Sequence, residues 1–186
     1  MTSVANIPDF AAVAAEHSAA LLRYLERQVR DPALAEDLLQ ETLIRIERGL
    51  PAFEGRSGLR TWAFSIATRV AIDHLRRPER KLAIVDFEEA DSVVDDNPAL
   101  DDRMIVDEMN ACVREVIDGL PPDYRAALIL YDLEGLSAAE VADAIGCTLA
   151  SAKIRVHRAR QRLRDALAKQ CNFYRDGDSV FRCSRS

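Results

Sequence analysis

The sequence predicts an all-α protein in which two small helical domains are joined by an acidic connector. Apolar residues recur at helical spacing along almost the whole chain of 186 residues, and alternating β-branched runs are few. Residues 56–81 hold seven Lys and Arg, and residues 149–164 hold six. Between these basic segments, residues 82–102 hold eight acidic residues and no basic one. This arrangement is typical of two binding modules joined by a tether that does not itself favour DNA.

The bulk composition indicates a soluble globular protein. Hydrophobic residues make up 48% of the chain and charged residues 30%, and no apolar run approaches the length that crosses a bilayer. The net charge of -6 does not exclude a nucleic-acid partner, because the sum hides the two basic segments. Residues 1–10 lack the basic and apolar regions of a secretory signal, so we expect a cytoplasmic protein.

The first domain should span residues 10–80 and contain three helices. Helical spacing predicts them over residues 11–29, 31–48 and 59–77. Asp31 suits the start of the second helix because its carboxylate can accept a hydrogen bond from a free backbone N–H, and Pro32 is tolerated in the first turn. A glycine-containing loop, residues 53–58, precedes the third helix, and Pro78 ends that helix.

The second domain should span residues 104–168. Residues 81–103 separate it from the first domain, and we interpret them as a flexible linker because they are acidic and lack a sustained period. Helical periodicity then predicts helices over residues 104–118 and 123–133, with a Gly-Leu-Pro-Pro break between them at residues 119–122.

The strongest local signal in the chain predicts a helix-turn-helix. Ser137 is followed three residues later by Glu140, which is the spacing of a capping box. Gly146 suits the end of that helix, and Thr148 can cap the next one after a short turn. Apolar residues of the second helix recur at spacings of four, three and four, so that one stripe packs inward: Ala152, Val156, Ala159 and Leu163.

This second helix has the composition of a helix that enters the major groove of DNA. Small and polar residues lie near its N-terminus, where bases are read, and arginines follow along the body, where phosphates lie. We expect Ser151 and Arg155 nearest the base edges, with Arg158 beside them. Phosphate contacts are expected from Lys153, Arg160 and Arg162. The alternative is a basic helix that merely faces solvent.

The first basic segment combines a glycine loop, an indole and several helix arginines. This combination suits single-stranded DNA, because the cations neutralise the backbone while an extruded base stacks or enters a pocket. Two plainer interpretations remain open. Trp62 can belong to the core of an amphipathic helix, and Asp73 can pair with an arginine of its own helix.

Two stretches of the chain resemble one family of proteins. Residues 31–46 (DPALAEDLLQETLIRI) and 59–77 (LRTWAFSIATRVAIDHLRR) resemble the first conserved domain of extracytoplasmic-function sigma factors, and residues 120–163 resemble the second. The two matches occur in the right order, with the acidic segment between them. The resemblance implies a promoter-specificity subunit of core RNA polymerase, which is not an enzyme, and an anti-sigma protein as a further partner.

The resemblance also implies roles for particular residues. Residues on the second helix would bind core polymerase: Asp37, Gln40 and Glu41. Residues of the loop and third helix would melt and read the minus-ten promoter element: Arg56, Ser57, Arg60, Trp62, Arg69, Asp73, Arg76 and Arg77. Residues of the helix-turn-helix would read the minus-thirty-five element as duplex: Thr148, Ser151, Lys153, Arg155, Arg158 and Arg160. Family members often carry Asn in place of Arg69 and Gly in place of Ala150. By the resemblance, the first departure concerns promoter preference at the melted element and the second concerns how the recognition helix enters the groove.

The tail, residues 169–186, contains two of the four cysteines of the chain. An Asp-Gly turn signal between aromatic and β-branched runs predicts a small hairpin. A three-residue loop at residues 176–178 would place Cys171 opposite Cys183. The pair could then bind zinc with help from His157 or Cys147, or close on oxidation. The alternative is two reduced, inert thiols, since no CxxC pair is present and a structural zinc needs four ligands. No other cofactor is expected.

Two other functions are compatible with the residues alone. A one-component regulator would use only the helix-turn-helix to bind duplex DNA, and it would ignore core polymerase. A helical adaptor or redox-responsive protein would act through the cysteine tail and need no DNA. No phosphate-binding glycine loop, zinc-protease motif or nucleophile elbow occurs in the sequence.

Overall fold

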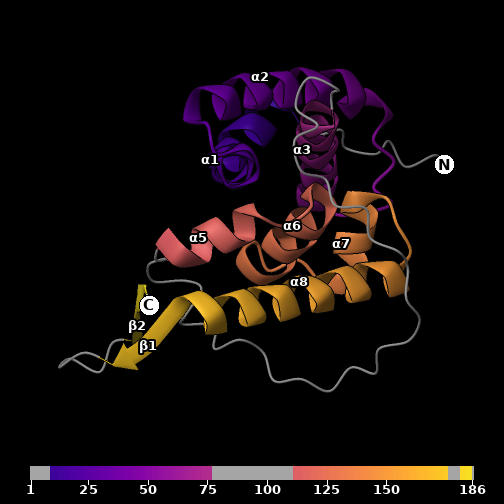
Figure 1. The fold of residues 1–186 in the computed structure, drawn as a ribbon. Coiled ribbons are helices and arrows are strands. Elements are labelled where there is room, and N and C mark those ends of the chain that lie inside the picture. Colours follow the sequence, from indigo (N-terminus) through magenta and orange to yellow (C-terminus); the bar gives the residue numbers. More distant parts are fainter. Residues whose placement is uncertain (1–8, 77–110, 176–180, 186) are drawn as a thin grey trace.

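The computed structural model describes residues 9–76, 111–175 and 181–185, which form two helical layers lying one on the other (Figure 1). The N-terminal module, as we call it, contains α1 (Phe10–Val29), α2 (Pro32–Gly49) and α3 (Leu59–Leu75). The C-terminal module contains α5 (Ala111–Asp118), α6 (Pro122–Leu128), α7 (Ala138–Ile145) and α8 (Leu149–Gln170). The predicted all-α fold of two small modules is confirmed.

The N-terminal module is built around a fully buried aromatic pair. The rings of Tyr24 on α1 and Phe64 on α3 meet edge to face with centroids 5.4 Å apart. The Tyr24 hydroxyl lies 2.8 Å from Thr68 Oγ1, and because the Thr68 hydroxyl donates to the Phe64 carbonyl, Tyr24 is the donor in this contact. Asp31 caps α2 as predicted, since its side chain accepts a hydrogen bond from the backbone N–H of Leu34.

The helix-turn-helix of the C-terminal module is also confirmed. Ser137 Oγ accepts from the N–H of Glu140, while the Glu140 carboxylate accepts from the N–H of Ser137 at 2.9 Å, which completes the capping box. Gly146 ends α7 with a φ of 69°, a conformation that favours glycine. Thr148 Oγ1 accepts from the Ser151 N–H at 3.1 Å and so caps α8. The predicted inward stripe is buried: Ala152, Val156, Ala159 and Leu163.

Several element boundaries differ from the sequence-based expectations. Helix α3 ends at Leu75, before the predicted limit. The helix predicted over residues 123–133 is divided, because α6 passes into a π-helical turn at Ile129–Leu133. Helix α5 is described only from Ala111, and the predicted acidic linker lies outside the described residues.

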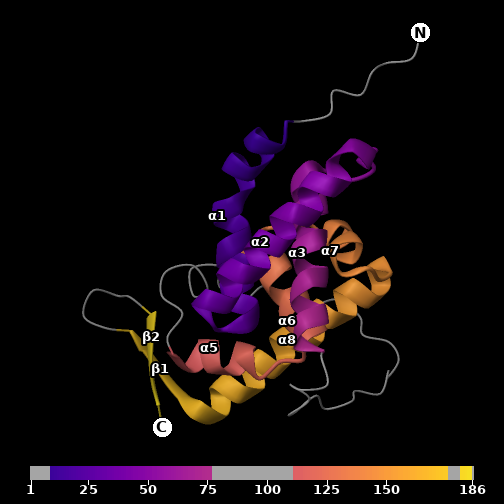
Figure 2. The same cartoon turned by 90° about the horizontal axis from the view of Figure 1, so that it is seen from above.

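A two-stranded antiparallel hairpin follows α8 and projects beyond its end (Figure 2). Its strands are β1 (Cys171–Arg175) and β2 (Phe181–Arg185). Cys171 pairs with Arg185, and Cys183 pairs with Phe173, so the prediction that Cys171 lies opposite Cys183 is wrong. The strands are separated by five residues instead of the predicted three, and two extra loop residues move each partner by two positions.

The two modules pack directly against each other, which the sequence did not predict. Helix α3 lies on α7, and α1 and α3 also contact α6. The Arg125 side chain of α6 donates to the Gln28 carbonyl of α1 at 2.5 Å. Its second terminal nitrogen donates to the carbonyls of Asp118 and Leu120 within its own module. A buried guanidinium therefore joins the modules through backbone carbonyls.

Candidate nucleic-acid interface

The N-terminal end of α8 presents a short polar surface. Thr148 is exposed and Ser151 is partly exposed, and their hydroxyl oxygens lie 2.9 Å apart. Ser151 is thus held by the residue that caps the helix. Lys153, one turn further on, is exposed. This end of α8 has the residue types and the exposure that a base-reading helix needs.

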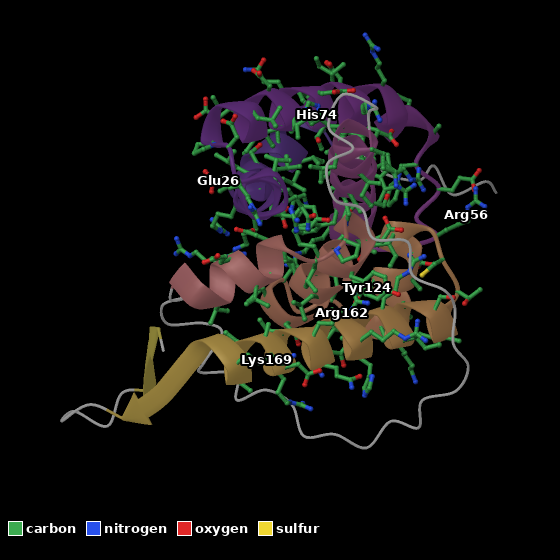
Figure 3. All side chains as sticks on the ribbon, viewed as in Figure 1. Glu26, Arg56, His74, Tyr124, Arg162 and Lys169 are labelled. Carbon is green, nitrogen blue, oxygen red and sulfur yellow. The ribbon has the colours of Figure 1, made fainter. Side chains whose placement is uncertain are left out.

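The arginines of α8 do not all point freely into solvent. Arg160 donates from Nε to Asp132 Oδ2 at 3.1 Å, makes a second bond to the same carboxylate, and stacks 5.0 Å above the Tyr131 ring. Arg162 stacks over the ring of Tyr124 with 5.4 Å between its guanidinium carbon and the ring centroid, and Figure 3 shows the two side chains between α6 and α8. These contacts position the arginines but compete with phosphate binding.

Arg155 is partly buried and lies 3.8 Å from Asp123 Oδ2. Asp123 lies in the first turn of α6. Arg158, the third candidate for base contact, is also only partly exposed. The predicted minus-thirty-five residues therefore flank the buried stripe of α8 on two sides. Arg155 lies toward Asp123 on one side, and Arg160 binds Asp132 on the other.

The loop before α3 carries a highly exposed residue of the predicted minus-ten set. The side chain of Arg56 is 86% exposed and pairs with Glu54 at 2.9 Å, and Figure 3 shows it projecting from the ribbon. Trp62 is only partly exposed, because its ring packs on Phe53 with centroids 4.9 Å apart. A Cβ at Gly49 would lie 3.0 Å from the indole, so a larger residue there would require the Trp62 ring to shift by a few tenths of an ångström.

Helix α3 divides the remaining minus-ten candidates into two groups. Arg69 and Asp73 are exposed, Ser57 in the preceding loop is partly exposed, and Arg77 lies outside the described residues. Arg60 and Arg76, in contrast, bind groups of the C-terminal module. Arg60 donates to the Glu134 carbonyl at 2.8 Å, and Arg76 donates to both carboxylate oxygens of Asp123 at 2.9 Å.

Sequence reasoning missed the acidic partners of these arginines. Asp123 is 47 residues from Arg76, and Glu134 is 74 residues from Arg60. No pattern of neighbouring residues predicts a contact between residues so far apart in the sequence. The excess of acidic residues in the C-terminal module outside α8 is the only signal, and it does not identify which carboxylates take part.

The predicted polymerase-binding residues lie on α2, on the side of the N-terminal module away from the C-terminal module (Figure 1). Asp37 and Gln40 are exposed, and Glu41 is partly exposed and pairs with Arg45 at 2.6 Å. Ile44 is 46% exposed beside them. A polar face with one exposed apolar residue suits a protein partner.

The possible zinc site of the tail stays a prediction. Among the side chains that the structure describes, no group of three His, Cys, Asp or Glu could hold a metal ion. Burial raises the pKa of the Cys147 thiol, which disfavours the thiolate that a metal needs. The side chains of Cys171 and Cys183 lie outside the described set. None of the helices within the described ranges combines the length and apolar composition needed to span a membrane.

Two family models match the chain. Residues 13–81 match the model for sigma-70 region 2, and residues 110–163 match the model for sigma-70, region 4. The first match covers the N-terminal module and extends beyond α3, and the second covers α5 to the middle of α8.

Individual relatives are similar over most of the chain. The identity is 33% to the ECF RNA polymerase sigma factor SigE of Mycolicibacterium smegmatis, over 89% of this chain and 64% of the relative. It is 34% to the RNA polymerase sigma-H factor of Pseudomonas aeruginosa, over 79% of this chain and 80% of the relative. It is 37% to the ECF RNA polymerase sigma factor SigX of Bacillus subtilis, over 77% and 76%. The chain thus spans slightly under two thirds of the first relative and most of the other two.

Solved structures show the same fold. The sigma factor RpoE, solved with the anti-sigma factor NepR from Bartonella quintana, has a TM-score of 0.65 and 26% identity, covering 86% of this chain and 97% of its own. CnrH, solved with the cytosolic domain of CnrY, has a TM-score of 0.60, covering 86% and 87%; at 21% identity it supports the fold alone.

Proposed function

Because the chain belongs to the extracytoplasmic-function family of RNA polymerase sigma factors, we propose that its two modules read the two elements of a promoter while α2 holds core polymerase. It is a transcription initiation factor and not an enzyme, and nucleotide addition belongs to the polymerase. The observation that supports the assignment best is the capped helix-turn-helix, which buries one stripe of α8 and leaves its polar N-terminal end exposed. The site of action is the cytoplasm, where promoter DNA and polymerase are found.

The C-terminal module reads duplex DNA at the minus-thirty-five element. The exposed N-terminal end of α8, capped by Thr148, enters the major groove, where Ser151 and Arg155 lie nearest the base edges with Arg158 beside them. Phosphates along the body of the helix are contacted by Lys153, Arg160 and Arg162. Asp132 and Tyr131 hold the Arg160 guanidinium in place. Its contact with a phosphate would therefore fix the orientation of α8 on the DNA backbone.

The N-terminal module melts the minus-ten element. Unstacking costs a few kcal/mol per base step, and this cost is offset by capture of an extruded base and by contacts to the strand backbone. Arg56 and Arg69 are exposed for such contacts in the free chain. Ser57, Trp62, Asp73 and Arg77 complete the surface, together with Arg60 and Arg76 once their partners in the C-terminal module are released.

Core polymerase binds the outer face of α2. Asp37, Gln40 and Glu41 provide the polar contacts, and Ile44 provides an apolar one. An anti-sigma protein is the further partner that we propose, because the solved relative RpoE was obtained with one. Such a protein would regulate the chain by covering the polymerase or DNA surfaces.

Run-off transcription on a promoter library tests this function. Purified core polymerase is assayed with no added factor, with the wild-type chain, and with an Asp37→Arg, Gln40→Ala variant. We expect the wild type to direct initiation at a defined two-element sequence and the variant to lose that transcript. Glu16→Arg on α1 changes the charge by the same amount on a different surface and should retain it.

The same assay can contradict the proposal. If core polymerase ignores the wild-type chain while the chain still binds duplex DNA, the protein acts as a one-component regulator instead. Loss of the transcript in the Glu16→Arg control would show that the effect is one of charge and not of the α2 surface.

A further inference from the structure

The hairpin that follows α8 places two cysteines on one of its faces. Strand β1 pairs with β2 in antiparallel register. Residues that are directly opposite share a face of a sheet, and every second residue along a strand returns to that face. Cys183 is directly opposite Phe173, and Phe173 is two residues from Cys171. Cys171 and Cys183 are therefore diagonal neighbours on the same face.

The diagonal spacing is too long for a disulfide bond. Diagonal neighbours in an antiparallel pair lie about 7–8 Å apart. A disulfide requires a Cα separation of about 4.4–6.8 Å, because a single sulfur–sulfur bond joins the two side chains. A metal ion held by both thiolates places two metal–sulfur bonds of about 2.3 Å each between the cysteines. The register therefore favours a metal bridge between Cys171 and Cys183 over a direct sulfur–sulfur bond.

The same face of the hairpin carries residue types that suit a metal-bound thiolate. Arg185 is directly opposite Cys171, and Phe173 is directly opposite Cys183. A guanidinium near a thiol favours the thiolate, which is the form that binds metal ions. An apolar neighbour limits the access of water to a metal site. The register thus adds one positive charge and one aromatic residue to the positions of the two cysteines.

Helix α8 separates the hairpin from His157 and Cys147, the two further ligands that the sequence suggests. The helix is continuous over the 22 residues from Leu149 to Gln170. An α-helix rises about 1.5 Å per residue, so His157 lies about 20 Å along the axis from Cys171. Cys147 precedes the opposite end of the helix, and the hairpin projects beyond α8 in Figures 1 and 2. This distance leaves Cys171 without either residue as a further ligand within one chain.

The number of ligands decides which kind of ion the hairpin suits. Thiolates are soft ligands that select Cu(I) and Zn²⁺ over hard cations. A structural zinc ion is four-coordinate, so two thiolates supply only half of its ligands. Cu(I) is a closed-shell monovalent ion whose coordination two thiolates in a linear arrangement complete. A pair of cysteines without further ligands thus matches a soft monovalent cation.

We propose that Cys171 and Cys183 form a two-thiolate site for a soft monovalent cation of the Cu(I) type. On binding, two S–H bonds break, two metal–sulfur bonds form and both protons pass to the solvent, and no electron is transferred. The hairpin lies at the end of α8 opposite the polar end that we place in the major groove (Figure 1). Metal binding at the hairpin is therefore independent of the proposed promoter contacts.

Anaerobic titration of the reduced full chain with Cu(I), in competition with bicinchoninate, tests the site. We expect the wild-type chain to take one Cu(I) from the competitor. Cys171→Ser, Cys183→Ser should weaken this binding by at least about a hundredfold, since even the loss of a residue that only supports a metal ligand costs about 10–100-fold. The matched variant Cys112→Ser, Cys147→Ser also removes two thiols but leaves the hairpin unchanged, and it should bind as the wild type does. Equal affinity of the wild type and the hairpin variant overturns the proposal.

A register variant tests the spacing of the two cysteines. Cys183→Ser, Arg185→Cys moves the second cysteine to the position directly opposite Cys171, where the Cα atoms of paired residues are about 4.5–5.5 Å apart. In an oxidising glutathione buffer this variant should form an intrachain disulfide, whereas the wild type should keep both hairpin thiols free. Mass spectrometry of alkylated peptides measures both. A disulfide between Cys171 and Cys183 in the wild type, or a register variant that stays reduced, overturns the metal bridge.

Zinc distinguishes a two-ligand site from a four-ligand site. In the presence of 4-(2-pyridylazo)resorcinol, we expect Zn²⁺ to stay with the chelator, because two thiolates leave the ion incompletely coordinated. X-ray absorption of the Cu(I) form should show two sulfur neighbours and no nitrogen. If a monomeric wild-type chain removes Zn²⁺ from the chelator and the Cys171→Ser, Cys183→Ser variant does not, further ligands complete the site and the assignment to a soft monovalent cation is wrong.

Discussion

At the scale of single residues, the charged side chain of Arg125 has a structural role. Arg125 is buried, and its guanidinium donates to carbonyls of both modules instead of to a carboxylate. Burial, and then the nearby charge of Arg30, lower its pKa to about 10. The side chain therefore remains protonated at neutral pH. Its planar geometry lets one residue reach several carbonyl oxygens that would otherwise be left without donors.

Replacement of Arg125 by Lys should destabilise the whole chain. An ammonium cannot reproduce the forked geometry, and buried carbonyls lose their donors. We expect the free energy of unfolding in urea to fall by about 1–3 kcal/mol. The matched Arg23→Lys change, at an exposed position of α1, should leave the unfolding midpoint unchanged. Equal midpoints for both variants would show that Arg125 has no structural role.

Glu140 makes the free energy of unfolding depend on pH. Hydrogen bonds from the Ser137 backbone, the Ser137 hydroxyl and the Thr61 hydroxyl lower the pKa of its carboxyl. A carboxyl with a lowered folded-state pKa stabilises the protein above the ordinary Glu range, and that stability is lost as the pH falls through the folded value. Glu140→Gln should therefore flatten the decline in unfolding midpoint between neutral pH and about pH 3. A slope identical to that of the wild type would contradict the assignment.

At the scale of elements, the capping interactions at helix ends shape the C-terminal module. Helix α7 spans only eight residues, too few to be stable alone, so its capping box and its glycine terminus decide where it begins and ends. Helix α8 is long and buries one stripe against α5, α6 and α7. The turn between them aims the polar end of α8 away from the module, which is the property that a DNA-reading helix needs.

Loss of the α7 cap should be measurable. Ser137→Ala removes the side-chain acceptor for the Glu140 N–H, and we expect a loss of about 1 kcal/mol in unfolding free energy. Ser18→Ala is the matched control, because Ser18 lies inside α1 and its hydroxyl donates only to the Ala14 carbonyl of the preceding turn. Chemical denaturation of both variants provides the comparison. An equal loss in the two would show that the cap contributes nothing specific.

At the scale of the whole molecule, the main feature is the contact between the two modules. Arginine and carboxylate pairs join the modules, and near them the side-chain amide of Gln28 is buried without a hydrogen-bond partner among the described residues. In the proposed function each module reads a different promoter element, so both modules act at one promoter.

Replacement of Gln28 by Met should stabilise the chain. Methionine has a similar volume and no amide, so the unsatisfied donor and acceptor disappear and the unfolding free energy should rise by about 1–3 kcal/mol. Gln40→Met, at an exposed position of α2, should leave the unfolding free energy unchanged. A destabilised Gln28→Met variant would show that the amide has a partner in solution.

The amino-acid sequence by itself determined the features that depend on neighbours along the chain. The period of apolar residues defined the helices, and Asp31, Ser137, Gly146 and Thr148 identified helix ends because capping acts within a few residues. The family resemblance added the order of the two modules and their roles. The hairpin was predicted, but its register was not, because the Asp-Gly signal is compatible with more than one loop length.

Only the tertiary structure decided which charged groups meet. The partners of Arg27, Arg60 and Arg76 lie between 47 and 107 residues away, beyond the reach of any local pattern. The same holds for the carbonyls around Arg125, since backbone acceptors carry no residue-specific signal. The identity of an arginine predicts that it will pair with an anion, but it does not predict which one. The packing of α3 on α7 decides which carboxylate lies within reach. Local rules thus specified the two modules, and long-range packing specified how the modules contact each other.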